Sequence, residues 1–517
     1  MQRATLPTAD LVVLLAYVTG IALLGCWFLR TSRTSRDFMI AGLGLPGWVV
    51  GLSIFATFLS SNTFLGVPGK AYATNWNAFV FSLSLPVAAW IAVRYFVPFY
   101  RRCGEVSAYA HLEKRFGAWA RMYAIICYLL TQLARMGAIL FGTALALQAL
   151  LGWRLQTIIL TIGIVATLYT VLGGIRAVIW TDVVQAVVLI LGAVIILLMV
   201  LLGMPGGPRE VLAIASQHGK LGLGDFSTRI SSSTFWVVLF YGLFVNLTNF
   251  GIDQNYVQRY HTANSDRAAA RSVWLGALLY VPISMAFFLL GTSLFSYYRT
   301  NESAMSDLKM RIAMEKPADP AVPLEARIAQ LSDAEVGDRV LPHFMTTRLP
   351  SGLAGLVIAA ILAAAMSSID SSLNSSATVY LSDIHRRYLN PGVDERGAMR
   401  VLHGFTAIWG AAGTAAALAM IGVQSVLDAW WKLSGIFAGG MLGLFLLGRL
   451  APRAGSRAAG AGVVCGVGVI AWMTLSPGSR LPESLQSPFH SSWIIVVGTL
   501  TILLVGMLVS KTATRQH

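Results

Sequence analysis

Charged side chains are scarce in this chain of 517 residues. Asp, Glu, Lys and Arg together make up 12% of it, about half the share that soluble domains carry. Hydrophobic residues account for 56%, and the mean hydropathy is +0.67. This composition excludes a disordered chain and an ordinary soluble domain, because so few charges could not cover so much apolar surface. We therefore expect an all-α polytopic membrane protein.

Cysteine and histidine are also few, at four and eight residues. The cysteines show neither C-x-x-C spacing nor a His partner, which argues against a metal or redox centre. The sequence has no His-Glu zinc motif, no recognisable pair of facing aspartates and no Ser with a His base. It is therefore not expected to be an enzyme.

Apolar runs recur from Leu11 to Val509. A helix needs about 20 residues to cross a bilayer, so about 13 transmembrane helices fit with short connections. The predicted spans are residues 8–29, 46–72, 77–99, 120–151, 156–173, 178–203, 233–258, 269–298, 351–383, 401–422, 425–448, 458–475 and 491–510.

Basic residues outnumber acidic ones by 38 to 23, which gives a formal charge of +15. They gather in every second connection rather than along one face, which argues against a nucleic-acid partner. The alternation predicts a multi-pass protein of the cell's inner (plasma) membrane, with its N-terminus outside and its C-terminus in the cytoplasm. The basic connections contain, among others, Arg33, Arg101, Arg176, Arg259, Arg386, Arg453 and Lys511.

Two spans are rich in polar and helix-breaking residues. Span 46–72 contains the run S-S-N-T at residues 60–63. Span 233–258 contains a polar run in which Gly251 is expected to break the helix. The two spans lie five helices apart, so they would occupy corresponding positions in two five-helix halves of opposite topology. Paired interrupted helices of this kind indicate a transporter with a binding site near the middle of the membrane.

This pattern divides the chain into five parts. They are residues 1–45 (an N-terminal helix and an inner loop), 46–203 (the first repeat), 204–232 (an outer loop), 233–448 (the second repeat, with a long outer loop at 299–350) and 449–517 (two C-terminal helices and a short cytoplasmic tail).

Arg135 lies near the centre of a predicted span, where an unpaired guanidinium costs at least about 2.5–3.5 kcal/mol. Two interpretations are open: an ion pair with an acidic residue of another helix, or a fork that binds the carboxylate of a solute. Asp253 and Gln254, near the inner end of another span, either form an inner gate or cap a helix end.

Oxygen-bearing side chains cluster in the stretch M-S-S-I-D-S-S-L-N. A hard monovalent cation needs a shell of oxygens, which hydroxyls, carboxylates and the carbonyls of a helix break supply. The side chains that offer such oxygens are Ser367, Ser368, Asp370 and Ser371. The alternative is hydrogen bonding between helices. Asp182, in another span, is either an interfacial carboxylate or a further member of such a site.

Four motifs resemble the sodium:solute symporter family, in the family's order and over nearly the whole chain. They are L-S-S-N-T-F-L-G at 59–66, G-G-I-R-A-V-I-W-T-D-V-V-Q at 173–185, D-Q-N-Y-V-Q-R at 253–259 and A-A-A-M-S-S-I-D-S-S-L-N-S at 363–375. The resemblance implies a LeuT-like core of ten helices in a 5+5 inverted repeat, with one helix before it and two after.

The resemblance also implies Na⁺ as the coupling ion and where it would bind. The principal sodium site would comprise the carbonyls of Ala56, Leu59 and Ala364 and the hydroxyls of Ser367 and Ser368. A second cation site, like that of some members, would comprise Asp182, Ser367, Asp370 and Ser371. The sialate-type members carry Ser where this chain has Asp370. Two possibilities therefore stay open: that Asp370 binds a proton, or that the protein binds a different set of ions.

The solute pocket is similar to that of the family's bacterial sialic acid transporters. The resemblance implies that Arg135, Ser60 and Thr63 bind a carboxylate. The resemblance implies three differences in the pocket. This chain has Phe58, Ala78 and Ser82 at positions where those transporters carry Thr, Phe and Gln.

We thus predict a sodium-coupled secondary active symporter that imports a small polar solute, bearing a carboxylate, by alternating access across the lipid bilayer. One alternative is a symporter of a neutral sugar or polyol, in which Arg135 is structural. A different class would be a substrate sensor or a channel-like conductor on the same fold.

Overall fold

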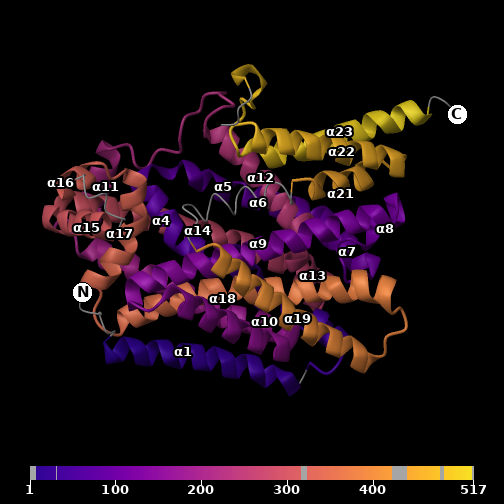
Figure 1. Cartoon of the computed structure of the whole chain (residues 1–517), viewed down its shortest axis with the longest axis horizontal. Helices are drawn as coiled ribbons and strands as arrows, with labels where there is room; N and C mark the ends of the chain where they lie inside the picture. Colours follow the sequence, from indigo (N-terminus) through magenta and orange to yellow (C-terminus); the bar gives the residue numbers. More distant parts are fainter. Residues whose placement is uncertain (1–6, 31, 316–322, 422–438, 478–481, 515–517) are drawn as a thin grey trace.

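Long helices that run side by side make up most of the molecule (Figure 1). The computed structural model describes residues 7–30, 32–315, 323–421, 439–477 and 482–514. In this part of the chain the only strand-like contact is an isolated bridge between Leu45 and Ala263. Ten helices are long and apolar enough to cross a membrane, or eleven when one bent pair is counted as a span. The protein is therefore an all-helical membrane protein, as predicted.

The membrane-crossing elements follow the predicted spans closely. In chain order they are α1 (Thr8–Trp27), the bent pair α3 (Gly47–Phe58) and α4 (Ser61–Ala73), the continuous stretch Trp76–Cys103, α9 (Ala118–Leu151), α10 (Leu155–Leu202), α12 (Phe235–Ile252), α14 (Asp266–Thr300), α18 (Leu353–Val379), α19 (Glu395–Ala419), α22 (Ser456–Leu475) and α23 (Trp493–Thr514). The stretch Trp76–Cys103 comprises η3 (Trp76–Phe79), α5 (Val80–Leu83), α6 (Leu85–Ile91), η4 (Ala92–Phe96) and α7 (Val97–Cys103).

Helix α10 contains two of the predicted spans. Its 48 residues would extend about 72 Å at 1.5 Å per residue, more than twice the thickness of a hydrocarbon core. Gly174 breaks it, with φ 59° and ψ −162°, a conformation that only glycine adopts readily. With α10 counted as two crossings, twelve of the thirteen predicted spans coincide with helices. The remaining one, 425–448, lies mostly outside the described residues, and its described end is α21 (Met441–Leu450).

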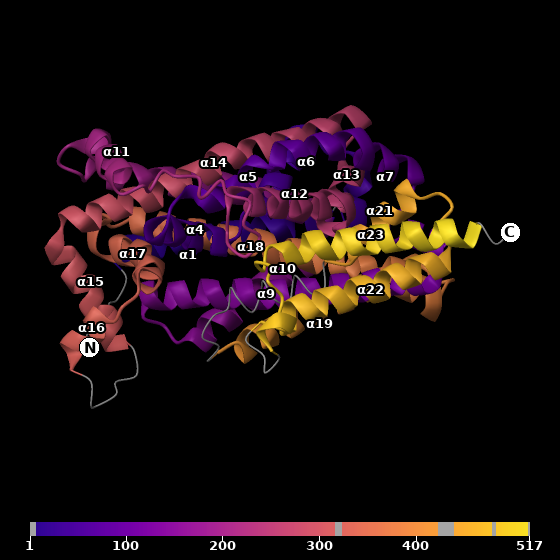
Figure 2. The same cartoon turned by 90° about the horizontal axis from the view of Figure 1, so that it is seen from above.

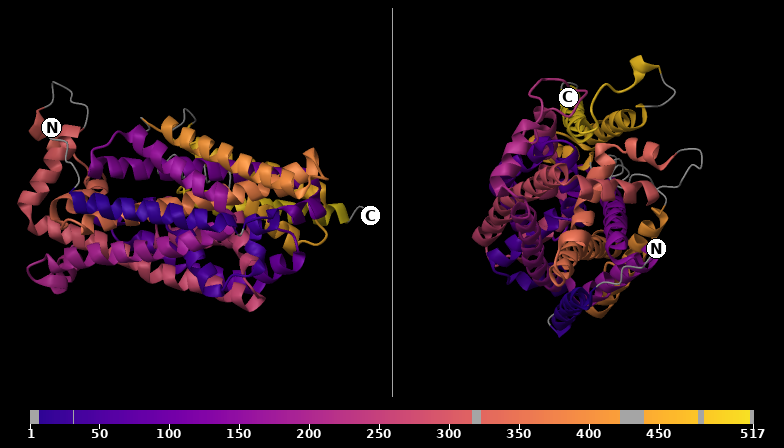
Figure 3. Two further views of the ribbon diagram at one scale, coloured as in Figure 1. Left: turned by 90° about the horizontal axis from the view of Figure 1, so that it is seen from below. Right: turned by 90° about the vertical axis from the view of Figure 1, so that its left-hand side faces the viewer.

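The connections at one end of the bundle are helical, whereas loops were predicted there. The connection 204–232 contains α11 (Gly207–Gln217), and the connection 299–350 contains α15 (Glu302–Glu315), α16 (Leu324–Ala329) and α17 (Asp333–Arg348). A capping box starts α17, because Ser332 and Glu335 satisfy each other's backbone N–H groups. Helices α11 and α15 to α17 gather at the end of the molecule where α1 starts, and α23 ends at the opposite end (Figures 1, 2 and 3).

Helix α17 packs directly on α4. A Cβ atom on Gly69 would lie 2.7 Å from the carbonyl oxygen of Gly337, so the two backbones touch where neither residue has a side chain. Through this contact, the helical connection 299–350 packs on α4, the second half of the bent pair.

The second interruption falls two residues later than predicted. Helix α12 ends at Ile252, Asp253 is extended (φ −79°, ψ 120°), and α13 (Gln254–Thr262) begins directly after it. Gly251, expected to be the breaking residue, is helical. Its lack of a side chain serves packing instead, because a Cβ there would lie 3.0 Å from the ring of Phe96.

We predict that Gly174→Ala destabilises the protein. A Cβ at Gly174 would lie 2.9 Å from both Phe38 Cα and Ser32 Oγ, and the backbone strain alone is worth about 1–3 kcal/mol. The midpoint of thermal unfolding of the detergent-purified protein should fall. Gly468→Ala is the matched control, because nothing lies within 4 Å of a Cβ there and Ala favours a helix. Equal midpoints for the two variants would contradict a glycine-specific break.

Candidate functional site

The break between α3 and α4 frees backbone groups in the middle of the bundle. The two helices meet at 56°, and Leu59 and Ser60 between them are extended. The side chain of Ser60 caps α4, since its Oγ accepts a 3.4 Å hydrogen bond from the N–H of Thr63. The Ser60 and Thr63 hydroxyls also lie 3.4 Å apart, so the predicted solute-binding pair forms one polar spot at the start of α4.

Helix α18 places its serines against this break. Ser367 Oγ lies 3.3 Å from the carbonyl oxygen of Ala56 and 3.3 Å from that of Ala364. Ser368 Oγ lies 3.3 Å from the same Ala364 carbonyl. Leu59 adjoins the group, because its N–H donates to the Ala56 carbonyl at 3.2 Å. The structure thus brings Ala56, Ala364, Ser367 and Ser368 of the predicted principal sodium site together, at the long end of hydrogen-bond distances. Leu59 lies next to them in the break.

One ion pair beside this group is fully buried. Arg259 of α13 donates to Asp182 Oδ2 at 2.8 Å, and both side chains are at most 1% exposed. The same guanidinium donates to Ser53 at 2.7 Å and to Ser371 at 2.7 Å. Arg259 had been predicted to lie in a basic connection, and that placement is wrong. Arg259 is the last residue of the motif D-Q-N-Y-V-Q-R, and its place in this motif was the available signal that it belongs to the site.

Two further contacts seat α13 along α18. Ser375 Oγ donates to Asn255 Oδ1 at 2.7 Å, and Gln258 Nε2 donates to Asn374 Oδ1 at 2.8 Å. The second interrupted helix therefore meets the same α18 surface as the first. Both breaks converge on one polar face, as expected for paired interrupted helices.

Asp370 receives hydrogen bonds from neutral donors. Tyr169 donates to its Oδ2 at 2.8 Å, and Thr181 lies at 3.5 Å from the same oxygen. In the described part of the chain, the other carboxylate oxygen has no hydrogen-bond partner, and neither does Asp182 Oδ1 nor the side-chain amide of Gln185. Two buried carboxyl groups lie near one guanidinium, so a second positive charge, from a proton or a cation, is needed to balance them.

Arg135 lies half-buried at the same level as the first break. Its Nη2 donates to the carbonyl oxygen of Thr57 at 2.9 Å. Among the described residues it forms no ion pair with an acidic side chain, so the structural ion pair that the sequence left open is not found. The guanidinium keeps most of its N–H groups for another ligand.

The other predicted solute residues have different surroundings. Phe58 packs against an aromatic wall of Phe250, Tyr256 and Tyr280, with ring centroids 4.7–5.6 Å apart. Ser82 is buried and shares its hydroxyl with Ser284 of α14 at 2.7 Å, so it is engaged in a contact between helices. Ala78, in η3, is partly buried.

The candidate inner gate consists of Asp253 and Gln254. Asp253 caps α13, because its Oδ1 accepts a 2.8 Å hydrogen bond from the N–H of Asn255. The buried side chain of Gln254 accepts from the N–H of Ala108 at 2.8 Å and donates to the carbonyl of Val106 at 2.9 Å. Asp253 thus has the capping role, and Gln254 binds the segment between α7 and α8 (Ala110–Phe116).

Membrane-crossing helices with two breaks that converge on buried hydroxyls and carboxylates define a secondary transporter. The family model of the sodium:solute symporter family matches residues 38–466. The chain belongs to this family, which confirms the prediction from its four motifs. It is a multi-pass, sodium-coupled solute symporter and not an enzyme.

Relatives of known name are similar over almost the whole chain. The sodium/sialic acid symporter NanT of Aliivibrio fischeri is 32% identical over 98% of this chain and 94% of its own length. SiaT of Proteus mirabilis is 34% identical over 95% and 94%. The sodium-coupled monocarboxylate transporter 1 of Homo sapiens is 27% identical over 86% and 68%.

Solved structures confirm the fold. A Na⁺-coupled sialic acid symporter in a substrate-bound, outward-open state has a TM-score of 0.85 and 29% identity, and the match covers 98% of each chain. Mhp1, a nucleobase-cation-symport-1 family transporter, has a TM-score of 0.57 at 14% identity, covers 94% and 96%, and shows a shared fold alone. The predicted LeuT-like architecture is thereby confirmed.

We predict that Asp182 and Arg259 are strongly coupled in stability. Asp182→Asn or Arg259→Gln alone leaves a buried charge without its partner, which costs about 3–5 kcal/mol. The double variant removes both charges and should recover part of that loss. Unfolding of all four proteins, followed in potassium buffer without sodium, gives the coupling free energy. A double variant whose loss equals the sum of the two single losses would show that the pair is not coupled.

Proposed function

We propose that this protein imports a small polar solute bearing a carboxylate, with sodium binding at the break between α3 and α4. The observation that carries the proposal is Arg135, a guanidinium at mid-span that contacts the carbonyl of Thr57 and no carboxylate of the described chain. A bound carboxylate would supply the missing counter-charge through two parallel N–H···O bonds. Ser60 and Thr63, on the other side of the break from that carbonyl, would donate to the same solute.

The proposed principal sodium site comprises carbonyls of Ala56, Leu59 and Ala364 and hydroxyls of Ser367 and Ser368. These uncharged oxygens suit a hard monovalent cation. Three pairs of these oxygens, Ser367–Ala56, Ser367–Ala364 and Ser368–Ala364, lie 3.3 Å apart. These distances support the proposal, because a cation between them would draw on the same oxygens that now share weak hydrogen bonds.

A second cation site is proposed at Asp182, Ser367, Asp370 and Ser371. Arg259 already binds Asp182 and Ser371, so its charge compensates only one of the two carboxylates. The free oxygen of Asp370 then carries the remaining negative charge, and a buried charge without a partner is costly. That imbalance favours a cation beside Asp370.

Coupling to sodium is energetically sufficient. One positive charge that crosses 100 mV releases about 2.3 kcal/mol. A tenfold sodium gradient adds about 1.4 kcal/mol. For a neutral solute, one ion could thus sustain a gradient of roughly several hundredfold, and two ions would square it. A solute with one negative charge cancels one of the positive charges moved, so one ion would sustain only about a tenfold gradient and two ions roughly a several-thousandfold one. Coupling follows if sodium stabilises the conformation in which residues 56–63 hold the solute.

The named relatives support an acid as the solute. They transport, by name, sialic acid and monocarboxylates. Phe58 stands where the resemblance implies Thr in the sialic acid transporters, and it packs against three further rings, which favours a solute that differs from sialic acid in its remaining groups. A neutral sugar or polyol is the alternative, and it would make Arg135 a structural donor to Thr57. We further propose that the N-terminus lies outside the cell and the C-terminus in the cytoplasm.

Ser368→Ala should weaken the dependence of uptake on sodium. Loss of this oxygen from the proposed principal site is expected to raise the half-saturating sodium concentration at least tenfold in proteoliposomes. Ser376→Ala is the matched control, because Ser376 is buried on the same helix and its hydroxyl has no partner among the described residues. An unchanged sodium dependence for Ser368→Ala removes Ser368 from the site. Uptake that is the same in potassium as in sodium would overturn sodium coupling itself.

Arg135→Gln should weaken the binding of acids and spare that of sodium. Acidic and neutral sugars and small organic acids are first screened for their effect on the midpoint of unfolding, with and without sodium, since a ligand of the native state raises it. The acid that stabilises the wild type should lose at least tenfold in affinity for Arg135→Gln. If neutral sugars stabilise the protein and Arg135→Gln keeps its affinity for them, the alternative function is correct.

A further inference from the structure

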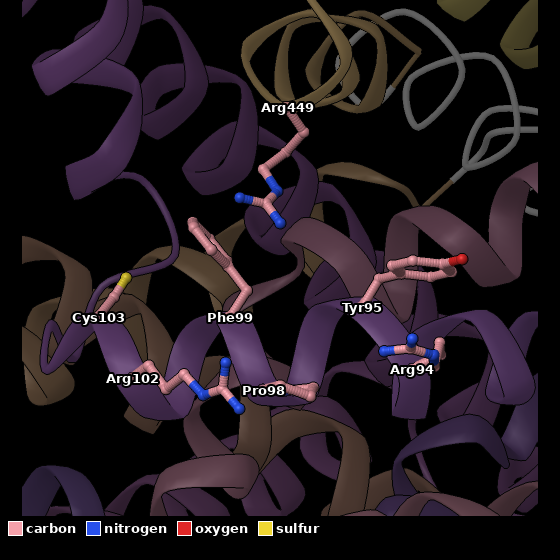
Figure 4. A pocket seen from close by; sticks show the side chains of 7 residues that line it. All are labelled: Arg94, Tyr95, Pro98, Phe99, Arg102, Cys103 and Arg449. Carbon is pink, nitrogen blue, oxygen red and sulfur yellow. The ribbon is translucent and has the colours of Figure 1, made fainter. Parts of the chain in front are cut away.

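Three arginines line a cavity far from the sodium and solute residues (Figure 4). The cavity has a volume of about 510 Å³ and lies between the stretch Trp76–Cys103 and the end of α21. Arg94 and Arg102 come from the first element and Arg449 from the last turn of the second. Figure 4 shows Arg94 and Arg102 on either side of Pro98, with Arg449 opposite them above Phe99.

The three guanidinium groups have no carboxylate partner in the described part of the chain. Arg449 lies over the ring of Phe99 at 4.6 Å and Arg94 over the ring of Tyr95 at 5.5 Å. In these two arginines the aromatic ring contacts the face of the guanidinium group, and the N–H groups at its edge stay free for a ligand. The neighbouring Arg101 differs, because it pairs with Asp266 and donates to the Tyr260 carbonyl at 2.7 Å. The cavity therefore carries three uncompensated positive charges.

The spacing of the basic groups suits a phosphate at the membrane surface. Arg94, Pro98 and Arg102 recur every four residues, so they share one face and span about 12 Å along the helix axis. Arg102 and Arg449 lie at the ends of their helices, on the side of the molecule where α23 ends. Arg94 lies deeper, and its long side chain can reach toward the headgroup level.

An apolar stripe continues from the cavity into the membrane. Val87 and Trp90 lie seven and four residues before Arg94 and are 51% and 55% exposed. They share its helix face, and Tyr95, at the cavity itself, is 50% exposed. A ligand with a phosphate at the arginines would thus have its hydrocarbon part beside these side chains.

We propose that this cavity binds the headgroup phosphate of an anionic phospholipid, whose acyl chains lie along Val87 and Trp90. Basic pockets between transmembrane helices recognise such headgroups, and the guanidinium fork matches phosphate geometry. The occupant is a lipid rather than free phosphate, because the apolar stripe would otherwise remain without a partner at the mouth of the site.

The test compares ligands and variants in neutral detergent. The probes are phosphatidylglycerol, phosphatidylcholine and inorganic phosphate, and binding is followed by native mass spectrometry and by the midpoint of thermal unfolding. For the wild type, phosphatidylglycerol should be retained and raise the midpoint, whereas the other two should not. The combined variant R94Q/R102Q/R449Q should bind phosphatidylglycerol at least tenfold more weakly.

The matched control removes the same charge elsewhere. R396Q/R400Q/R457Q loses three exposed arginines outside the cavity and should bind phosphatidylglycerol as the wild type does. Equal retention by both triple variants overturns the proposal, and so does stabilisation of the wild type by inorganic phosphate to the same extent. If the first variant does not fold, the three probes on the wild type and on R102Q still decide it.

Discussion

The contact between the broken helix α3/α4 and α18 is the interaction on which the rest of the structure depends. Hydrocarbon cannot solvate backbone carbonyls, so a helix break is tolerated only where other groups meet it. Ser367 of α18 meets the Ala56 carbonyl of the break, and α18 is buried on nearly every side. The polarity that stabilises the break is the same polarity that a cation needs. Stability and ion binding therefore share one set of atoms.

Charge balance explains the surroundings of that contact. Arg259 from the second interrupted helix neutralises Asp182, while Asp370 keeps an oxygen without a partner. On the other side of the break, Arg135 carries a positive charge without a carboxylate partner among the described residues. The proposed cation site therefore offers two carboxyl groups to one guanidinium, and the proposed acid site offers a guanidinium that forms no ion pair with a described carboxylate. A protein of this design favours its two ligands together, because each completes a different part of one break.

The sequence predicted the architecture well because hydrophobic length and breaker density are local signals. The break at residues 59 and 60 follows from hydroxyl, Gly and Pro residues within an apolar run, and twelve spans follow from length. Arg259 was missed because an arginine just after a predicted span looks like any residue of a basic connection. Only the fold shows that α13 turns it inward. The second break was misplaced at Gly251, because the aspartate that caps α13 competes with glycine as a stopping signal. The helices of the connections 204–232 and 299–350 were missed because their polarity is also typical of loops.

The most direct test of the account is the linkage between sodium and solute at equilibrium. If both ligands complete the same break, sodium must tighten solute binding, and solute must tighten sodium binding by the same factor. Titration calorimetry of the purified protein, with each ligand at fixed concentrations of the other, measures both factors. The account predicts two equal factors well above one. A solute affinity that is the same in sodium and in potassium would contradict it.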